Sequence, residues 1–204
     1  MFNLQRWKFN IVRLTSGAYK SQKGKVENTI YHAITIEMII PQFPELEITI
    51  KLFKNCPKES FPPIDSNFGI IDAANIYSSN VLYAAIYKAF IESKYLKMRT
   101  KNLNSEVLLS LYASTNIGEA FRQIGLNQNT TKNIITISIT DKNSTSAIDQ
   151  NINGGECVEF NDANLAEVRD VEKIKSIYKL NQELANDEHD LEDLIVNSIQ
   201  LRGI

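Results

Sequence analysis

The chain has 204 residues, 43% of them hydrophobic and 23% charged, which is the composition of a single globular domain that needs no disulfide or metal to hold its core. A formal net charge of -2 and a pI near 5.8 exclude general polyanion binding, because the far field of the protein repels nucleic acid, so any anion site must be local. No apolar run approaches the roughly 18 residues of a membrane span, so we expect no contact with a membrane.

Residues 1–37 differ in character from the rest of the chain. They carry a net charge of +4, whereas residues 156–204 carry -7. Scarce acids and a polar Ser/Gly/Lys stretch are faintly typical of a mitochondrial transit peptide, but serines are few and arginines number only two. We therefore interpret residues 1–37 as an N-terminal extension, disordered or preceding a misassigned start, and residues 38–204 as the folded domain.

Residues 38–96 predict one strand and one long helix. Apolar and polar residues alternate from Ile48 to Phe53, which predicts a strand, and residues 54–69 are dense in helix and strand breakers, which predicts a loop. Ser78 or Ser79 can then cap a helix that runs to about Leu96. The face expected to point inward contains Leu82, Ile86, Ala89, Phe90 and Ser93.

The remaining chain predicts shorter elements. Asn102 or Asn104 can cap a short helix with Glu106 in its first turn, although a strand is also possible there. Further helices are expected after Asn116 up to Gly125, after Asp170, and from residues 187–190 to Arg202. Strands are expected at residues 133–140 and 157–160. The two cysteines, Cys56 and Cys157, are far apart in the sequence and fit a reducing compartment as free thiols.

A basic segment, KYLKMRTKNL at residues 94–103, places Lys94, Lys97, Arg99 and Lys101 within eight positions without an intervening acid. Cations in the last turn of a helix meet the negative end of its dipole, which contributes about 0.3–1 kcal/mol and is sufficient reason for Lys94 and Lys97. It does not explain Arg99 and Lys101, which lie beyond the helix. The segment is therefore either a solvated loop or a binding site for a few phosphates.

The last predicted helix is apolar over an unusually wide arc. At 100° per residue, its apolar side chains span roughly 220°, whereas a surface helix commonly shows a stripe near 100° wide. The side chains in this arc are Leu191, Leu194, Ile195, Val196, Ile199 and Leu201. Either two internal neighbours cover them, or part of the arc meets another protein.

Signatures of catalysis are missing from the sequence. Neither His32 nor His189 lies in a recognisable catalytic motif, and there is no phosphate loop, nucleotide fingerprint or zinc-ligand spacing. Asp72, Glu106 and Glu119 have simpler roles as turn or cap residues. We expect no catalytic residues, no metal and no cofactor, and a binding protein rather than an enzyme.

One long stretch carries a family resemblance. Residues 83–126, YAAIYKAFIESKYLKMRTKNLNSEVLLSLYASTNIGEAFRQIGL, resemble the kinase-binding small subunit of the KEOPS (EKC) complex, the TPRKB family. The resemblance resumes at VEFNDANL and VEKIKSIYKL, ends with SIQLRGI as in fungal members, and spans about residues 38–204. Relatives begin with a segment like MIIPQFP, which favours Met38 as a start.

The resemblance implies a fold and a function. The fold would be a single α+β domain with a mixed β-sheet flanked by helices. The function would be non-catalytic: binding of the atypical kinase/ATPase of KEOPS, which links the chain indirectly to the other subunits, and capture of the single-stranded 3′ CCA end of tRNA. The complex makes threonylcarbamoyladenosine in ANN-decoding tRNAs, and fungal members are also linked to telomere maintenance. The resemblance implies that the protein would be cytoplasmic and nuclear.

The resemblance also implies where partners bind. A short basic loop suits a single-stranded RNA end, so we expect tRNA contacts at Lys94, Lys97, Arg99, Lys101, Asn102 and Asn104. The kinase interface is expected at Leu194, Leu201 and Arg202. The chain departs from its relatives between Phe53 and Ile71, which is shorter and holds three prolines, and at Ala73, where many relatives have proline. The alternative is a stand-alone RNA-binding or enzymatic domain with an unrecognised site.

Overall fold

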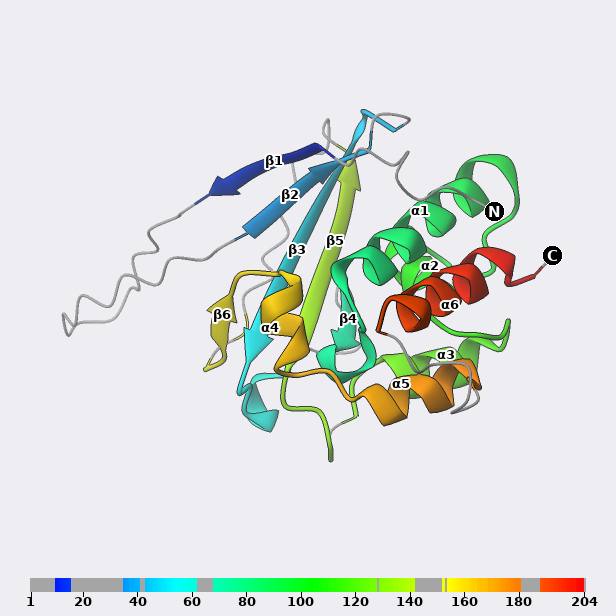
Figure 1. The fold of residues 1–204 in the computed structure, drawn as a ribbon. Helices are drawn as coiled ribbons and strands as arrows, with labels where there is room; N and C mark the ends of the chain where they lie inside the picture. Colours follow the sequence, from blue (N-terminus) through cyan, green and yellow to red (C-terminus); the bar gives the residue numbers. More distant parts are fainter. Residues whose placement is uncertain are drawn as a thin grey trace.

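The computed structural model of the chain describes residues 10–15, 35–40, 43–61, 68–127, 129–141, 152, 154–180 and 188–203. The strands are β1 (Asn10–Thr15), β2 (Thr35–Ile39), β3 (Leu46–Lys54), β4 (Gly69–Asp72), β5 (Ile134–Asp141) and β6 (Glu156–Val158). The helices are η2 (Lys58–Ser60), η3 (Ala73–Asn75), α1 (Ser79–Tyr95), α2 (Leu103–Ser110), α3 (Ile117–Ile124), α4 (Asp162–Ala166), α5 (Val171–Tyr178) and α6 (Glu188–Leu201). Their arrangement confirms the predicted α+β class (Figure 1).

The strands form one sheet in the order β1-β2-β3-β5-β4, with β6 also paired to β3. Every strand pair among the described residues is antiparallel, where we expected a mixed sheet. The reason is that the helical segment between β4 and β5 leaves and re-enters the sheet at the same end, since Asp72 is the register partner of Ile134. That return forces the two strands to run in opposite directions.

Strand β3 is the centre of this sheet because it pairs with other strands along both of its edges. All of its residues except Lys54 pair with β5, from Leu46 opposite Asp141 to Phe53 opposite Ile134. On its other side β2 pairs with Ile48–Ile50 and β6 pairs with Leu52–Lys54. The expected alternation holds, since Ile48, Ile50 and Leu52 are buried in the main core.

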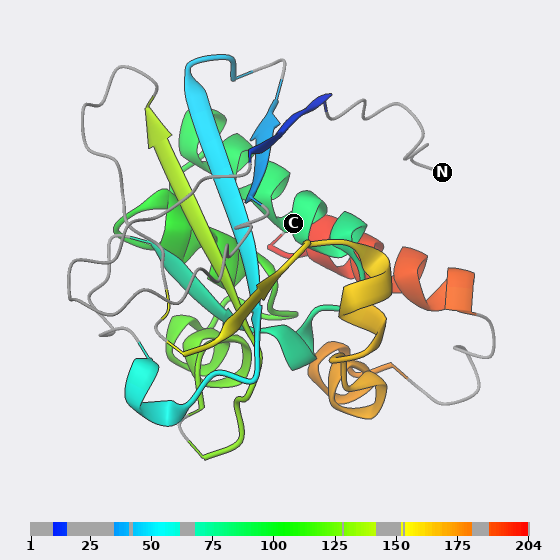
Figure 2. The same ribbon diagram turned by 90° about the vertical axis from the view of Figure 1, so that its left-hand side faces the viewer.

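The helices α1, α2 and α6 lie together on one side of the sheet in both views (Figures 1 and 2). Helix α1 begins after Ser78, whose hydroxyl accepts a hydrogen bond from the Val81 amide, and ends before Leu96, as predicted. Four of the five residues expected to point inward are buried: Leu82, Ile86, Ala89 and Phe90. Ser93 is exposed, because the last turn of α1 extends past the core.

Two predictions concern parts of the chain that the structure covers incompletely. The predicted domain boundary after residue 37 falls inside β2, and residues 1–9 and 16–34 lie outside the described ranges, so the boundary remains a prediction. Of the region 54–73, residues 62–67 lie outside them too, and the described part holds the short helices η2 and η3 and strand β4. Among the described residues, no helix has the length and apolarity required to cross a bilayer.

Candidate interaction site at the ends of helices α1 and α6

Helices α1 and α6 pack side by side and run in the same direction. Near their N-termini, Asn80 Nδ2 donates to Glu192 Oε1 at 2.7 Å, and further along Lys88 Nζ donates to the carbonyl of Gln200 at 3.0 Å. The parallel arrangement brings the C-terminal ends of both helices to one end of the molecule. The predicted basic loop, residues 94–101, lies there as well, because its first two residues complete α1 and the others follow directly after that helix.

Glu106, on α2, holds the basic loop in place. Its side chain is fully buried, and Oε2 accepts three hydrogen bonds: from the amide of Arg99 at 3.1 Å, the amide of Thr100 at 2.8 Å and the hydroxyl of Thr100 at 2.6 Å. Burial alone would raise the pKa of Glu106, but the hydrogen bonds from Thr100 and Arg99 outweigh it and leave that pKa lowered. The loop backbone is thus fixed to a buried carboxylate.

The four predicted cations of this loop differ in their surroundings. Lys94 lies with its Nζ 4.8 Å from the centroid of the Phe43 ring, a cation–π contact. Lys97 and Lys101 are exposed and form no ion pair with any residue that the structure describes. The guanidinium of Arg99 reaches back toward the end of the chain, because a Cβ built on Gly203 would lie 3.3 Å from its Nη2.

The two predicted asparagines support the backbone around the loop. Asn102 caps α2, as predicted, since its Oδ1 accepts a hydrogen bond from the Ser105 amide at 2.8 Å. Asn104 Oδ1 accepts one from the amide of Ile139 at 3.1 Å, which fastens α2 to β5. Asn102 is exposed and Asn104 half-buried, so Asn102 is the better placed of the two to meet a ligand.

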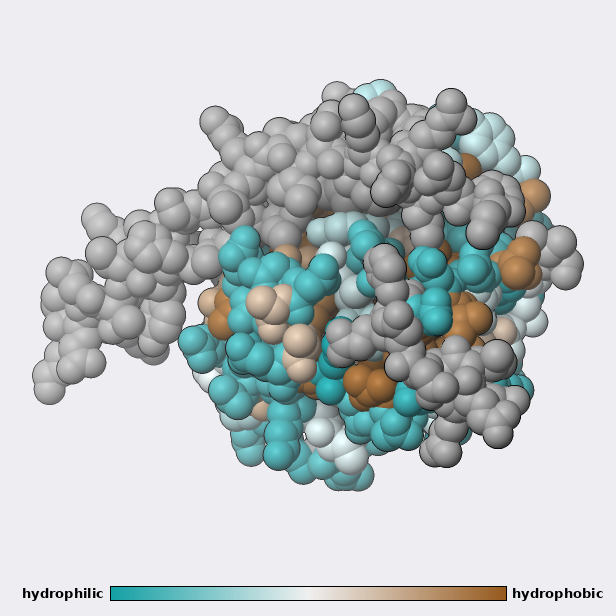
Figure 3. Space-filling model, in the orientation of Figure 1, coloured by the Kyte–Doolittle hydropathy of each residue, from teal (hydrophilic) through white to brown (hydrophobic). Residues whose placement is uncertain are grey.

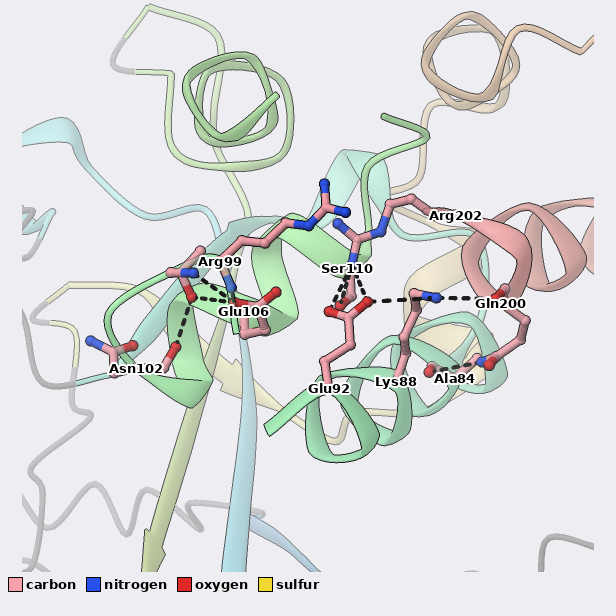
Figure 4. A network of polar contacts seen from close by, with 10 residues as sticks. Ala84, Lys88, Glu92, Arg99, Asn102, Glu106, Ser110, Gln200 and Arg202 are labelled. Atoms are coloured by element: carbon pink, nitrogen blue, oxygen red, sulfur yellow. Dashed lines mark hydrogen bonds and ion pairs between the residues drawn. The ribbon is translucent and has the colours of Figure 1, made fainter. Parts of the chain in front are cut away.

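Arg202 is buried, not outward-facing as we expected. Its Nη2 donates to both carboxylate oxygens of Glu92, at 3.2 and 3.1 Å, and to Ser110 Oγ at 3.2 Å (Figure 4). Helical periodicity could not show this, because Arg202 follows the last residue of α6 and turns inward between α1 and α2. Arg202 therefore connects α1, α2 and α6. A bound kinase would contact the residues around Arg202 and not its side chain.

Five charged side chains gather in this region: Lys88, Glu92, Arg99, Glu106 and Arg202 (Figure 4). Burial, followed by contact with Glu106, raises the pKa of Glu92. Burial also lowers the pKa of Lys88 and of Arg202 from their ordinary values, against the opposing effect of Glu92. The charges of Lys88, Glu92 and Arg202 depend on one another. Each side chain has lost water on burial, and the opposite charges of its neighbours offset that cost.

Around this buried cluster the surface carries exposed apolar side chains. Tyr95 and Leu96 are each 68% exposed, and Leu201 is 65% exposed. Leu194 is half-buried, whereas Leu191, Ile195, Val196 and Ile199 are buried, so the wide arc of α6 is mostly covered from inside. Hydrophobic surface interrupts the hydrophilic surface on the side where α6 ends (Figure 3). One end of the molecule thus combines apolar and basic groups.

The rest of the described chain offers little catalytic chemistry. No group of three or more His, Cys, Asp or Glu suited to a metal ion exists among the described residues. Cys56 is buried and Cys157 is half-buried, and the two are not joined by a disulfide. His32 lies outside the described ranges, and of His189 the structure describes only the backbone, in the first turn of α6.

Sequence reasoning missed the buried ionic cluster. Helix-capping patterns predict Glu106 only as a first-turn residue, yet its position beside the apolar run VLLSL is a signal that its carboxylate is buried. The contact between Glu92 and Arg202 joins residues 110 positions apart, and no local pattern reveals such a pair.

Comparison with known proteins matches residues 51–203 to the model of a family described as kinase binding protein CGI-121. The EKC/KEOPS complex subunit CGI121 of Candida glabrata is 34% identical over 172 residues, covering 81% of this chain and 98% of the relative. The protein of that name from Schizosaccharomyces pombe is 33% identical over 177 residues, covering 81% and 99%, and that from Candida albicans is 28% identical over 202 residues, covering 83% and 100%. The chain belongs to the CGI-121 family, which confirms the resemblance seen in its sequence. Membership in a family of non-catalytic kinase-binding proteins agrees with the prediction that the chain is not an enzyme.

Proposed function

We propose that the chain is an EKC/KEOPS subunit that docks the atypical kinase/ATPase of the complex and holds the 3′ CCA end of tRNA during threonylcarbamoyladenosine modification of ANN-decoding tRNAs. Family membership and the names of its relatives support the first part. The observation that carries the second is the exposed pair Lys97 and Lys101 on a loop that Glu106 fixes from inside. Work in the nucleus as well as the cytoplasm, including telomere maintenance, belongs to the same proposal.

The kinase interface is proposed at the end of α6, with Leu201 as its exposed centre, Leu194 at its half-buried margin and Arg202 as the buried support. Leu201 is exposed, and so are Tyr95 and Leu96 where α1 ends, so this end of the molecule offers a partner apolar area to bury. A Leu201→Asp variant should weaken co-elution with the kinase by about tenfold or more, because it places a charge in an apolar contact. Ala163→Asp, on exposed α4, is the matched control and should bind normally. Equal binding by both variants would place the interface elsewhere.

The tRNA site is proposed on the basic loop, with Lys94, Lys97, Arg99 and Lys101 facing phosphates and Asn102 or Asn104 facing a base or ribose. Single-stranded RNA shows a slope of about -0.7 in log–log salt dependence per phosphate neutralised. A site for two or three phosphates therefore gives a slope of only about -1.4 to -2.1, which fits one basic loop on an acidic protein.

Charge reversal tests this site. The double change Lys97→Glu and Lys101→Glu should weaken binding of intact tRNA. The control, Lys58→Glu with Lys132→Glu, changes the net charge equally at exposed positions after β3 and before β5 and should have little effect. Removing CCA from the tRNA should weaken the wild type to a similar extent, and the two losses should not add. If the charge-reversed protein still distinguishes intact from trimmed tRNA as well as the wild type does, the loop is only solvated.

Purification also tests the proposal, because a KEOPS subunit co-purifies with its kinase and shows no turnover by itself. Activity that persists after complete removal of the kinase would contradict it.

A further inference from the structure

The basic loop and the end of α6 are joined by a continuous chain of contacts through α2. Glu106 binds the amides of Arg99 and Thr100 in the loop. One helical turn further along α2, Ser110 accepts a hydrogen bond from Arg202 at 3.2 Å. Residues four apart lie on the same face of a helix, so Glu106 and Ser110 present one polar edge to both segments.

This chain of contacts is buried and incompletely paired. Glu106 Oε1 and the Nε and Nη1 atoms of Arg202 have no hydrogen-bond partner among the described residues, although all three atoms are buried. The cluster holds three cations, Lys88, Arg99 and Arg202, against the two carboxylates of Glu92 and Glu106 (Figure 4). Buried ionic groups with unmet partners respond strongly to any added or removed charge.

Arg99 is the member of the cluster that can respond to a ligand. Its residue is exposed, and its guanidinium lies between the loop and the last residues of the chain, close to Gly203. Burial lowers the pKa of Lys88 and of Arg202, and the positive charge of Arg99 lowers both further. Arg99 therefore repels these two cations. An anion that neutralises Arg99, or draws it toward solvent, therefore removes a repulsion from the cations Lys88 and Arg202, whose contacts hold α6 in place.

We propose that Glu106 and Arg202 are positioning residues that couple the two proposed binding surfaces, so that an anion at the basic loop strengthens docking of a partner at the end of α6. The identity of the two ligands rests on the proposed function, whereas the coupling itself is a property of this chain alone. By linkage the effect is reciprocal: a partner on α6 strengthens anion binding by the same factor. Couplings of this kind commonly amount to about 5–150-fold in affinity.

Amide hydrogen exchange of the isolated full chain tests the coupling without either ligand. In a Glu106→Gln variant, the amides of Arg99 and Thr100 should exchange faster, and so should those of the last turn of α6, residues 198–201, by about fivefold or more. The distant effect is expected because Arg202 loses one of its two compensating carboxylates. The control is Glu119→Gln, which removes an exposed pairing with Arg122 on α3 and should leave α6 unchanged.

Faster exchange in the loop with unchanged exchange in α6 would overturn the coupling. If Glu106→Gln fails to fold, Thr100→Val provides a milder test, because it removes only the hydroxyl that donates to Glu106 at 2.6 Å. The same pattern is expected: faster exchange in the last turn of α6, although Thr100 does not touch that helix. An effect confined to residues 99–106 would again contradict the proposal.

A binding cycle then measures the coupling with ligands. Kinase affinity is determined with and without a short single-stranded RNA ending in CCA, for the wild type and for Glu106→Gln. The RNA should tighten kinase binding to the wild type by about fivefold or more and leave the variant nearly unaffected. If both ligands bind the wild type and neither changes the affinity of the other, the coupling is wrong while the proposed function stands. If the kinase does not bind, the proposed function fails and hydrogen exchange decides the coupling.

Discussion

The hydroxyl of Tyr178 on α5 donates a 2.6 Å hydrogen bond to the backbone carbonyl of Leu111, which ends α2. Both residues are buried, and their contact ties the C-terminal half of the domain to the helix that supports the basic loop. Burial raises the pKa of the Tyr178 phenol, so it remains a donor at every physiological pH.

Replacing Tyr178 with Phe should lower the free energy of unfolding by about 1–3 kcal/mol, because the Leu111 carbonyl would remain buried without this donor. Urea denaturation followed by circular dichroism measures the change. Tyr95→Phe removes the same hydroxyl from a residue that is 68% exposed and should change stability little. Equal effects of the two substitutions would show that the Leu111 carbonyl finds another donor.

The ionic cluster predicts a dependence of stability on pH. Because the pKa of Glu106 in the folded chain is below its ordinary 4.5, its carboxylate stabilises the fold above pH 4.5, and this contribution is lost as the pH falls below 4.5 toward the lower folded value. Glu106→Gln should therefore be less stable than the wild type at neutral pH, and the difference should shrink in acid. Urea denaturation across this range tests it, and a constant difference at every pH would contradict it.

Glu92 should show the opposite dependence. Burial raises the pKa of Glu92 above its ordinary 4.5, so the stability associated with its protonated form is present below pH 4.5 and is lost as the pH rises through the higher folded value. Glu92→Gln should remove this loss, although it also weakens the contact to Arg202. Urea denaturation across the same pH range should therefore distinguish Glu92 from Glu106, because their contributions to stability change in opposite directions with pH.

Cys56 should be unreactive in the native protein. Burial, and secondarily the neighbouring Cys157, raises the pKa of the Cys56 thiol to about 11, so almost none of it is thiolate near neutral pH. Alkylation by iodoacetamide followed by peptide mass spectrometry should modify Cys56 only after unfolding in urea. Rapid modification of the folded chain would show that the segment around Cys56 opens readily.

A chain that starts at Met38 should fold and bind as the full chain does. Of the residues whose side chains the structure describes, the main core begins with Ile40. The truncation removes β1 and the part of β2 that pairs Ile36 with Ile50. Thermal unfolding and kinase binding measured on both chains test the prediction, and a clear loss of either would make residues 1–37 part of the domain.

Local signals predicted the helices well. Ser78, Asn116 and Asp170 each accept the expected capping hydrogen bond, and Gly125 ends α3 as predicted. These positions are encoded within three or four residues, where side-chain and backbone chemistry suffice. Strand β4 and helix α4 were missed because four and five residues are too short to show a period.

The candidate site was predictable only in part. The cations of the basic loop and the exposed Leu201 are visible as sequence patterns. The burial of Arg202 and the hydrogen bonds between Glu106 and Thr100 depend on tertiary packing. The partners of a buried charge are residues close in space, which local sequence does not show.

The central pairing of β3 with β5 has a consequence for how the chain folds. Phe53 meets Ile134 and Leu46 meets Asp141, so the middle of the sheet closes only after a long intervening segment has been placed. Contacts between positions so distant in sequence slow folding, since the entropy of closing the loop is lost before the pairing compensates for it. During synthesis, β3 leaves the ribosome well before β5 and has an unpaired edge in the meantime. A nascent chain of this protein is therefore exposed to strand-to-strand aggregation for longer than a helical protein of equal length, and we expect its yield to depend on chaperones and on the rate of translation.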